Sequence, residues 1–282
     1  MQIGFTFPQY EIGADPAEVR ALAQAAEEMG YRHLVAYDHV LGAEPAHYPD
    51  VRFVYTYRTM FHEPFVLFGY LAGLTKRLQF LTGILILPQR QTALVAKQAA
   101  EVDVLSGGRL ELGVAIGWNP VEYTALGMNF HTRGKLLEEQ IQVLRLLWTQ
   151  EIVTFKGRWH NIDHAGINPL PVQRPIPLWI GGYSEAIIDR AARLADGLMG
   201  PDPQKVRERA KVLGRDVSHL RVRGGVRLPK FDFATAGEQV RLGEAAGVTH
   251  FTVNGLDAGY KGAEQHIAAL RRFKEAAGKE WR

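Results

Sequence analysis

The stretch Leu-Ser-Gly-Gly-Arg-Leu-Glu-Leu-Gly-Val-Ala-Ile-Gly-Trp, residues 105–118, decides the fold class of this chain. Its Gly107-Gly108 pair tolerates left-handed backbone and predicts the end of a helix. An apolar strand is expected to follow at once over 109–116, and a second glycine-bearing turn at Gly117 ends it. The predicted unit is therefore a helix, then a strand, then a turn at the carboxyl end of the strand. When such a unit is repeated around a closed parallel sheet, all of these turns lie on one face, where small molecules bind.

Short apolar runs alternate with amphipathic segments along the whole chain. The helical segments show buried faces at i, i+3, i+4 spacing, as at Val19, Leu22 and Ala26. Strands that alternate with helices predict parallel strands joined by right-handed crossovers, and eight rounds favour a closed barrel over an open sheet. We therefore predict an α/β fold, a (β/α)8 TIM barrel, as one domain over residues 1–282. The expected strands are 2–7, 33–37, 78–84, 109–116, 177–180, 196–199, 220–226 and 249–253.

Two segments exceed what a minimal barrel needs, one after the second strand and one after the fourth. Residues 42–62 are rich in aromatic side chains: Tyr48, Phe53, Tyr55, Tyr57 and Phe61. Residues 120–177 contain an amphipathic helix around Leu137 and Trp148 and then a hairpin expected to turn at Lys156-Gly157. Because both insertions follow strands, both are expected on the active-site face, where long loops often form lids or pocket walls.

The composition excludes several classes of protein. The chain has no cysteine, so it has no disulfide, thiol nucleophile or thiolate metal site. Its formal net charge of +3 is spread along the chain without a basic run, which argues against nucleic-acid binding. The start of the chain does not resemble a signal peptide, and no apolar stretch is long enough to cross a membrane. A cytoplasmic protein without membrane contact is the resulting expectation.

Several motifs, in this order and spacing, resemble the bacterial luciferase-like family of flavin- and deazaflavin-dependent oxidoreductases. They cover most of residues 1–200: Asp38-His39, Thr82-Gly83-Ile84-Leu85, the 104–113 stretch, Gly117-Trp118, Glu122-Tyr123, Arg133, the 153–159 segment and Pro177-Leu-Trp-Ile-Gly-Gly. The resemblance implies a (β/α) barrel with the cofactor ring in a cleft at the carboxyl ends of the strands. Trp118, Arg133 and Trp148 are most similar to the branch that depends on coenzyme F420, the deazaflavin. Trp118 stands where the sugar-phosphate dehydrogenases of the family have an acidic residue, which argues against their reaction.

The resemblance assigns a catalytic role to His39 and a cofactor contact to both Asp38 and His39. A histidine at the end of a barrel strand can exchange a proton near neutral pH or donate a hydrogen bond to the ring. The alternative for His39 is a purely structural cap of the strand. Asp38 would point away from its neighbour on a strand, so it can equally serve to orient nearby backbone.

Further cofactor contacts are expected at the ends of the third and fourth strands. Many relatives have a non-prolyl cis peptide at the position of Gly83-Ile84, against the back of the ring. The alternative is that Gly83 is a glycine required only by packing or by a bulge in a buried strand. Ile116, Gly117 and Trp118 end the fourth strand. The missing side chain of Gly117 is expected to let a planar ring approach the backbone, whereas Trp118 can equally be a core residue.

The phosphate of the cofactor is expected at Gly181, Gly182, Tyr183 and Ser184. These residues follow the fifth strand and precede an amphipathic helix. Free N–H groups at a helix N-terminus form a ready anion site, and the Ser184 hydroxyl can add a hydrogen bond. The alternative is an ordinary capped turn that binds nothing.

Two other features carry less weight. His160, Asp163 and His164 have a spacing that could suggest a metal site, but they lie in a hairpin and loop, so no metal is expected. The aromatic residues Phe53, Tyr55, Tyr57 and Phe61 could line a pocket, pack in the core or form a dimer contact.

Three functions fit these residues. The first is hydride transfer between coenzyme F420 and a small organic substrate, with His39 handling a proton. Basic residues at the site entrance, Arg90 or Arg133, would favour the charged tail of F420 over FMN. The second is an FMN-dependent two-component monooxygenase with a separate reductase, and the third is a flavin-binding protein without catalysis. The expected partners are a small-molecule substrate and, as is common in the family, a second copy of the chain.

Overall fold

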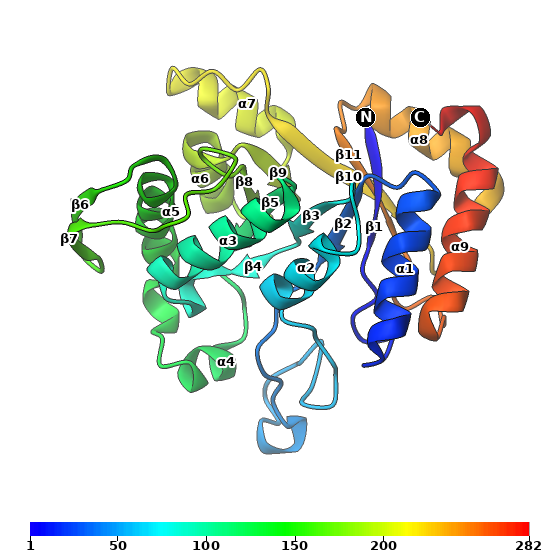
Figure 1. The fold of residues 1–282 in the computed structure, drawn as a ribbon, viewed down its shortest axis with the longest axis horizontal. Helices are drawn as coiled ribbons and strands as arrows, with labels where there is room; N and C mark the ends of the chain where they lie inside the picture. The colour runs from blue at the N-terminus through cyan, green and yellow to red at the C-terminus, as the bar shows by residue number, and fades with distance from the viewer. Residues whose placement is uncertain (282) are drawn as a thin grey trace.

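Parallel strands form a closed ring with helices around it in the computed structural model, which describes residues 1–281 (Figure 1). The sheet order is β3-β2-β1-β11-β10-β9-β8-β5-β4, and β3 also pairs with β5, which closes the barrel. The predicted (β/α)8 TIM barrel is therefore confirmed. Its strands are β1 (Gln2–Thr6), β2 (His33–Ala36), β3 (Gln79–Thr82), β4 (Leu85–Ile86), β5 (Leu110–Ala115), β8 (Leu178–Gly181), β9 (Gly197–Met199), β10 (Arg221–Arg227) and β11 (His250–Asn254).

The third barrel position is divided between two short strands. β3 pairs with the first part of β5 through Phe80 and Leu110, and β4 pairs with its last part through Leu85 and Val114. The peptide bond between Gly83 and Ile84, which separates β3 from β4, is cis. The strand expected over 78–84 is thus β3 alone, which ends at Thr82 before the position that the resemblance marked, and β4 follows beyond the expected range.

Helices cover the outside of the barrel (Figure 1). The predicted helix end at 107–108 is confirmed, because Gly107 adopts the left-handed conformation (φ 70°) and the Gly108 N–H donates to the Asp103 carbonyl over 2.8 Å. The helices are α1 (Pro16–Glu28), α2 (Pro64–Ala72), α3 (Thr92–Ser106), α4 (Pro120–Ala125), α5 (Arg133–Thr149), α6 (Glu185–Leu194), α7 (Pro203–Val212), α8 (Ala236–Ala245) and α9 (Gly262–Ala277). Short 3-10 turns occupy Pro45–His47, Leu87–Gln89, Phe130–Thr132, Phe233–Thr235 and Gly278–Glu280.

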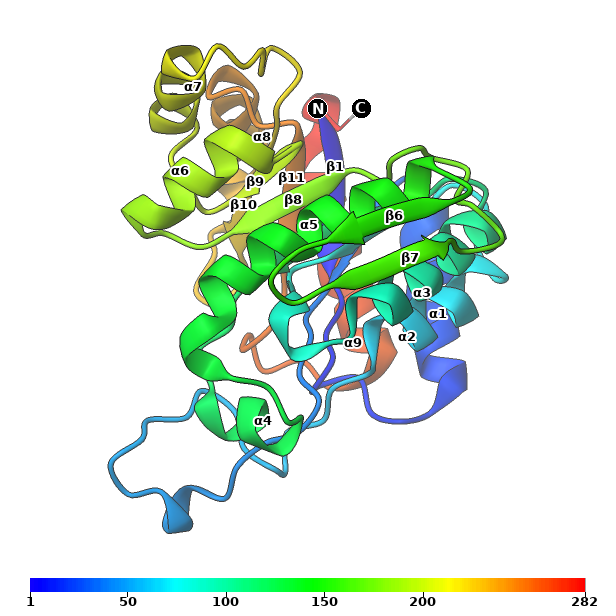
Figure 2. The same cartoon turned by 90° about the vertical axis from the view of Figure 1, so that its left-hand side faces the viewer.

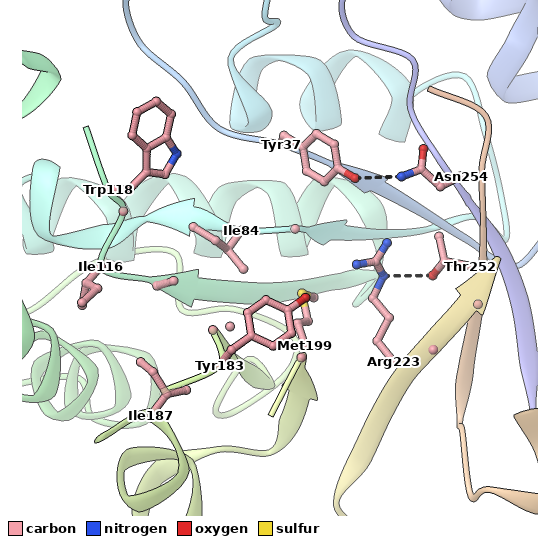
Figure 3. A pocket seen from close by; sticks show the side chains of 18 of the residues that line it. Tyr37, Ile84, Ile116, Trp118, Tyr183, Ile187, Met199, Arg223, Thr252 and Asn254 are labelled. Atoms are coloured by element: carbon pink, nitrogen blue, oxygen red, sulfur yellow. Dashed lines mark hydrogen bonds between the residues drawn. The ribbon is translucent and has the colours of Figure 1, made fainter. Parts of the chain in front are cut away.

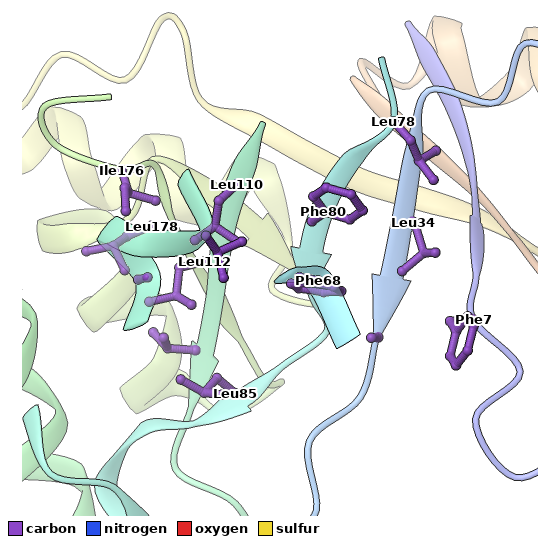
Figure 4. Packing of buried hydrophobic residues seen from close by; sticks show 14 of the residues in the cluster. Phe7, Leu34, Phe68, Leu78, Phe80, Leu85, Leu110, Leu112, Ile176 and Leu178 are labelled. Carbon is purple, nitrogen blue, oxygen red and sulfur yellow. The ribbon is translucent and has the colours of Figure 1, made fainter. Parts of the chain in front are cut away.

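The main core lies between the strands and the helices. Leu34, Phe80 and Leu110 are fully buried there, with Phe68 of α2 stacked on Phe80 at 5.2 Å (Figure 4). The inside of the barrel is different, because its small apolar cluster is accompanied by charged side chains. Glu111, for example, accepts hydrogen bonds from the Trp179 indole (2.6 Å) and the Arg221 guanidinium (2.7 Å). A polar barrel interior departs from the Val, Ile and Leu layers that fill most such barrels.

The insertions lie in two places. Residues 42–62 and α4 project from the carboxyl ends of the strands, as expected (Figures 1 and 2). The hairpin of β6 (Val153–Lys156) and β7 (Asn161–Ala165) instead packs on the flank, against α5 (Figure 2). Glu139 of α5 accepts the backbone N–H groups of Arg158, Trp159 and His160 and fixes its tip. The expectation that the whole second insertion lies on the active-site face is wrong for this hairpin, because the hairpin follows the helix and not the strand. Its loop spans 157–160 and is longer than the predicted two-residue turn.

Among residues 1–281, no helix combines the length and apolar character that crossing a bilayer requires.

Candidate functional site

A cavity of about 830 Å³ lies at the carboxyl-terminal mouth of the barrel (Figure 3). Its size suits a small organic ligand. Nine of the residues predicted to contact a cofactor line it together, although they come from three separate segments at strand ends: Gly83, Ile84, Ile116, Gly117, Trp118, Gly181, Gly182, Tyr183 and Ser184. The structure thus brings these residues to one place, and their contact with a cofactor stays a prediction.

Two glycines of this wall are also required by packing. Gly117 has φ +62°, and a Cβ there would lie 2.7 Å from Cγ2 of Ile86. A Cβ on Gly181 would lie 2.7 Å from Cγ2 of Ile84. The expectation that Gly117 lets a planar ring approach the backbone stays a prediction, because Gly117 lines the cavity, and the contact with Ile86 adds a packing reason for its missing side chain. These glycines let the isoleucines of the β4 segment pack against the neighbouring strands.

The turn after β8 provides unused hydrogen-bond donors beside the cavity. Ser184 is the N-cap residue of α6, and its hydroxyl makes no capping hydrogen bond. Within residues 1–281, no hydrogen bond uses the amide N–H groups of Tyr183, Ser184 or Glu185. These groups and the hydroxyl lie where the positive end of the helix dipole adds to them. The turn can therefore bind an anion, as predicted from its sequence.

Asp38 lies outside the cavity wall. Its carboxylate is buried and accepts hydrogen bonds from the Ile86 N–H (2.9 Å) and from the Arg90 guanidinium (2.6 Å). The part that Asp38 plays in this structure is to fix β4 and Arg90. This placement corrects the expectation of a direct cofactor contact and agrees with the alternative that Asp38 orients nearby backbone.

His39 lies in a second cavity of about 400 Å³ that shares Tyr37, Trp118, Arg227 and Asn254 with the first. Its ring is stacked on Tyr55, with ring centroids 3.7 Å apart. Phe61 also lines this cavity, and Tyr57 is exposed. Some residues of the aromatic stretch therefore form a pocket wall, one of the alternatives left open by the sequence.

Glu122 contacts the His39 ring at Nδ1 and orients it. The two side chains are 3.4 Å apart, from Nδ1 to Oε2, and Glu122 is fully buried. Its carboxylate also accepts hydrogen bonds from the Val40 N–H (2.6 Å) and the Tyr55 hydroxyl (3.1 Å). Burial acts to raise the pKa of Glu122, but the hydrogen bonds from His39 and Val40 outweigh it and leave that pKa below its ordinary value. Because a carboxylate can only accept, Nδ1 of His39 carries the proton, and Nε2 of the neutral ring is left as an acceptor.

The two arginines expected at the site entrance do not line either cavity. Arg90 is bound by Asp38 and by Glu63, at 2.8 Å. Arg133 lies 3.5 Å over the Phe130 ring and donates to the Phe130 carbonyl. The expectation that Arg90 or Arg133 receives a charged cofactor tail is wrong for both, because each is already engaged with protein groups.

The residues suspected of metal binding lie apart. His160 is held by Glu139 (2.8 Å) and Thr92 (2.5 Å), whereas Asp163 and His164 bond to each other on the surface. No group of three or more His, Asp or Glu side chains in the described part of the chain is arranged to hold a metal ion.

Sequence reasoning missed the polar side chains on the opposite wall. Arg223 of β10 and Thr252 and Asn254 of β11 line the large cavity, as does Tyr37 after β2 (Figure 3). The Arg223 Nε–H donates to the Thr252 hydroxyl over 3.0 Å. Burial lowers the pKa of Arg223. A usable signal was the presence of arginines at alternate positions, 221 and 223, in a barrel strand, since one face of every such strand points into the barrel.

The fold and the cavity together define a (β/α)8 barrel with a ligand site at the carboxyl ends of its strands. Residues 3–240 match the model of the luciferase-like monooxygenase family, and the chain belongs to this family. It is 38% identical over 192 residues to an uncharacterised protein of Mycobacterium tuberculosis, which covers 66% of each chain. It is 33% identical over 181 residues to an FMNH2-dependent dimethylsulfone monooxygenase of Pseudomonas fluorescens, covering 63% of this chain but only 46% of that protein.

Solved structures show the same fold. An F420-dependent secondary alcohol dehydrogenase, in complex with an F420-acetone adduct, superposes with a TM-score of 0.76. The match covers 100% of this chain and 99% of the dehydrogenase at 20% sequence identity. At this identity the likeness establishes the fold alone. Family membership identifies the chain as an oxidoreductase or monooxygenase of the luciferase-like type.

Proposed function

We propose that this chain is an oxidoreductase that holds coenzyme F420 in the 830 Å³ cavity and transfers hydride between it and a small organic substrate. The observation that carries this proposal is an apolar cavity that lies beside a turn of free N–H groups at one end of the barrel. This pairing suits a ligand with a planar ring and a phosphate. When bound, such a cofactor supplies the redox chemistry.

The residues of the cavity fit this kind of cofactor. Ile84, Ile116 and Met199 present apolar side chains to the cavity. The Ser184 hydroxyl and the N–H groups of Tyr183 and Ser184 are the groups that would hold the phosphate. The cavity wall contains no carboxylate among the described residues, and its Arg223 donates to the Thr252 hydroxyl and not to an acidic group, which also favours an anionic ligand.

His39 is the residue that we propose for proton exchange. Oxidation of an alcohol or reduction of a carbonyl moves a proton together with the hydride, so the site needs a group that holds this proton. Nε2 of His39 is available for it, because Nδ1 donates to Glu122. Glu122 is a positioning residue that fixes the tautomer and the ring orientation. The 400 Å³ cavity beside His39 gives a substrate room next to the cofactor, which a protein that only stores a cofactor does not need.

F420 and FMN are the two candidate cofactors, and both have a supporting observation. The resemblance of Trp118, Arg133 and Trp148 to the F420-dependent branch favours F420. Chain length does not separate the two candidates, because a long-chain alkane monooxygenase matches 99% of this chain and the F420-dependent dehydrogenase matches 100% of it. The 33% identity to the monooxygenase favours the second candidate, an FMN-dependent monooxygenase that receives reduced flavin from a separate reductase.

A paired titration of the purified protein with oxidised F420 and with FMN tests the proposal. The fluorescence of each compound is followed as protein is added. We expect micromolar or tighter binding of F420 and much weaker binding of FMN. Tighter binding of FMN would replace the first candidate by the second, and a failure of both to bind would refute the proposal.

A further inference from the structure

Arg223 is a cation without a counter-ion inside the barrel. Of the two arginines in the cavity wall, Arg227 is paired with Asp257 at 2.9 Å. Arg223 donates to Thr252, and no carboxylate of residues 1–281 lies within ion-pair distance of it. Figure 3 shows its guanidinium group beside Thr252 in the cavity. The Arg223 side chain is half-buried and lines the cavity, so a ligand with a negative charge would compensate its charge.

The groups around Arg223 are donors as well. The Tyr37 hydroxyl accepts a hydrogen bond from Nδ2 of Asn254 over 3.2 Å, which leaves its own O–H free to donate. Oδ1 of Asn254 is occupied, because it accepts the Leu256 N–H over 3.0 Å. This end of the cavity therefore offers positive charge and O–H or N–H donors. An oxyanion is the ligand group that complements such a set.

This donor set is separate from the proposed phosphate turn. Ser184 follows the end of β8, at Gly181, by three residues. In the sheet, Val222 pairs with Leu198 and Gly181 pairs with Met199, so Arg223 lies level with the end of β8 but two strands further round the barrel. One anion site thus follows β8 and the other lies on β10, on a different wall of the cavity. Tyr37 and Asn254 also line the cavity that contains His39, so the site on β10 faces the substrate side.

We propose that Arg223, with Tyr37 and Asn254, binds the carboxylate or a similar oxyanion of the substrate, and that the substrate is a small organic acid with an apolar body. The apolar body suits the aromatic wall formed by Tyr55, Phe61 and Trp118. This inference rests on the proposed function, because it places the substrate beside the cofactor. It makes Arg223 the residue that selects anionic over neutral substrates.

The test compares benzoate, phenylacetate and benzenesulfonate with the neutral benzamide as ligands. Their affinities are measured by the absorbance change of the cofactor-loaded protein and, separately, by the thermal shift of the free protein. We expect at least one anion to bind about 10-fold or more tightly than benzamide, as for a charge-assisted hydrogen-bonded pair. Arg223→Met should remove this preference, and Arg223→Lys should retain part of it. Arg227→Met is the matched control and should change anion affinity at most about threefold, because Arg227 is already paired.

Three results would overturn the inference: no anion binds better than benzamide, Arg223→Met keeps the preference, or Arg223→Met weakens the cofactor and leaves the anions unaffected. The last result would mean that Arg223 faces the cofactor ring. If the wild-type protein binds neither F420 nor FMN, the proposed function fails. The thermal shift of the free protein still decides the role of Arg223 in that case, because an anion should stabilise the wild type and not Arg223→Met.

Discussion

Replacement of Ser184 by aspartate should weaken cofactor binding without weakening the fold. Ser184 is the exposed N-cap of α6, and aspartate is as good an N-cap as serine. The helix should therefore keep its stability. The new carboxylate would stand among the free N–H groups of Tyr183 and Ser184, where we propose that the phosphate binds. It would compete for these donors and repel the phosphate.

The size of the effect follows from Coulomb's law. Two unit charges 4 Å apart repel by about 1 kcal/mol in water and by about 4 kcal/mol at the effective dielectric constant near a protein surface. Because Ser184 is exposed, the lower part of this range applies. Loss of a hydrogen bond to the phosphate adds about 1 kcal/mol. A total of about 2 to 3 kcal/mol corresponds to an affinity loss of roughly 30- to 150-fold.

The assay is a fluorescence titration of the wild type, Ser184→Asp and Ser184→Asn with the cofactor that the wild type binds. Asparagine caps a helix as well as aspartate does but adds no charge. The Asn variant should therefore bind within about threefold of the wild type, with thermal unfolding of all three proteins as the control for folding. Equal affinities of the Asp and Asn variants would refute the assignment of this turn to the phosphate.

Three further predictions follow from other parts of the structure. His39→Gln should lower turnover about 100-fold and leave cofactor affinity unchanged, because the substitution removes the proposed proton-exchange group. Turnover is measured with a substrate identified by screening, and unchanged turnover would show that His39 does not exchange the proton. Burial, with the nearby His250 and Arg223, holds the pKa of His33 well below its ordinary value. The unfolded chain therefore binds more protons below about pH 6.5, and stability falls there by up to about 1.4 kcal/mol per pH unit as the pH decreases. Urea unfolding at pH 7.5 and 5.5 should show a smaller loss for His33→Gln, and an equal loss would contradict this. Light scattering at micromolar concentration should give the mass of a dimer, and a monomer mass would show that the family's common assembly does not apply.

The barrel could be predicted because its signals are local. Most of the strands are short apolar runs, with β10 as an exception, and glycines such as Gly107 mark helix ends by a backbone conformation that only glycine adopts easily. The turn Gly181–Ser184 was found for the same reason, since its residues are contiguous and precede an amphipathic helix. The Gly83-Ile84 segment was selected by resemblance to the family and not by a local signal, and the structure has a cis peptide there.

The remaining parts of the site depend on contacts between distant segments. His39 and Glu122 are 83 residues apart, and only the closed barrel brings them together. Asp38 was expected to contact the cofactor, but its carboxylate instead binds Arg90. Because Arg90 lies 52 residues further along the chain, the sequence around Asp38 does not indicate this pairing. The alternate arginines 221 and 223 indicate one face of β10, but this pattern does not reveal whether a carboxylate faces Arg223. Side-chain pairing across a fold is decided by packing, which a single sequence does not display.

A crystal structure of the protein with oxidised F420 would show where the cofactor binds. We expect the ring in the 830 Å³ cavity, in contact with Ile84 and Ile116, and the phosphate within hydrogen-bond distance of the Tyr183 and Ser184 N–H groups. A cofactor bound elsewhere, for example in the cavity beneath the β6–β7 hairpin near Trp159, would contradict it.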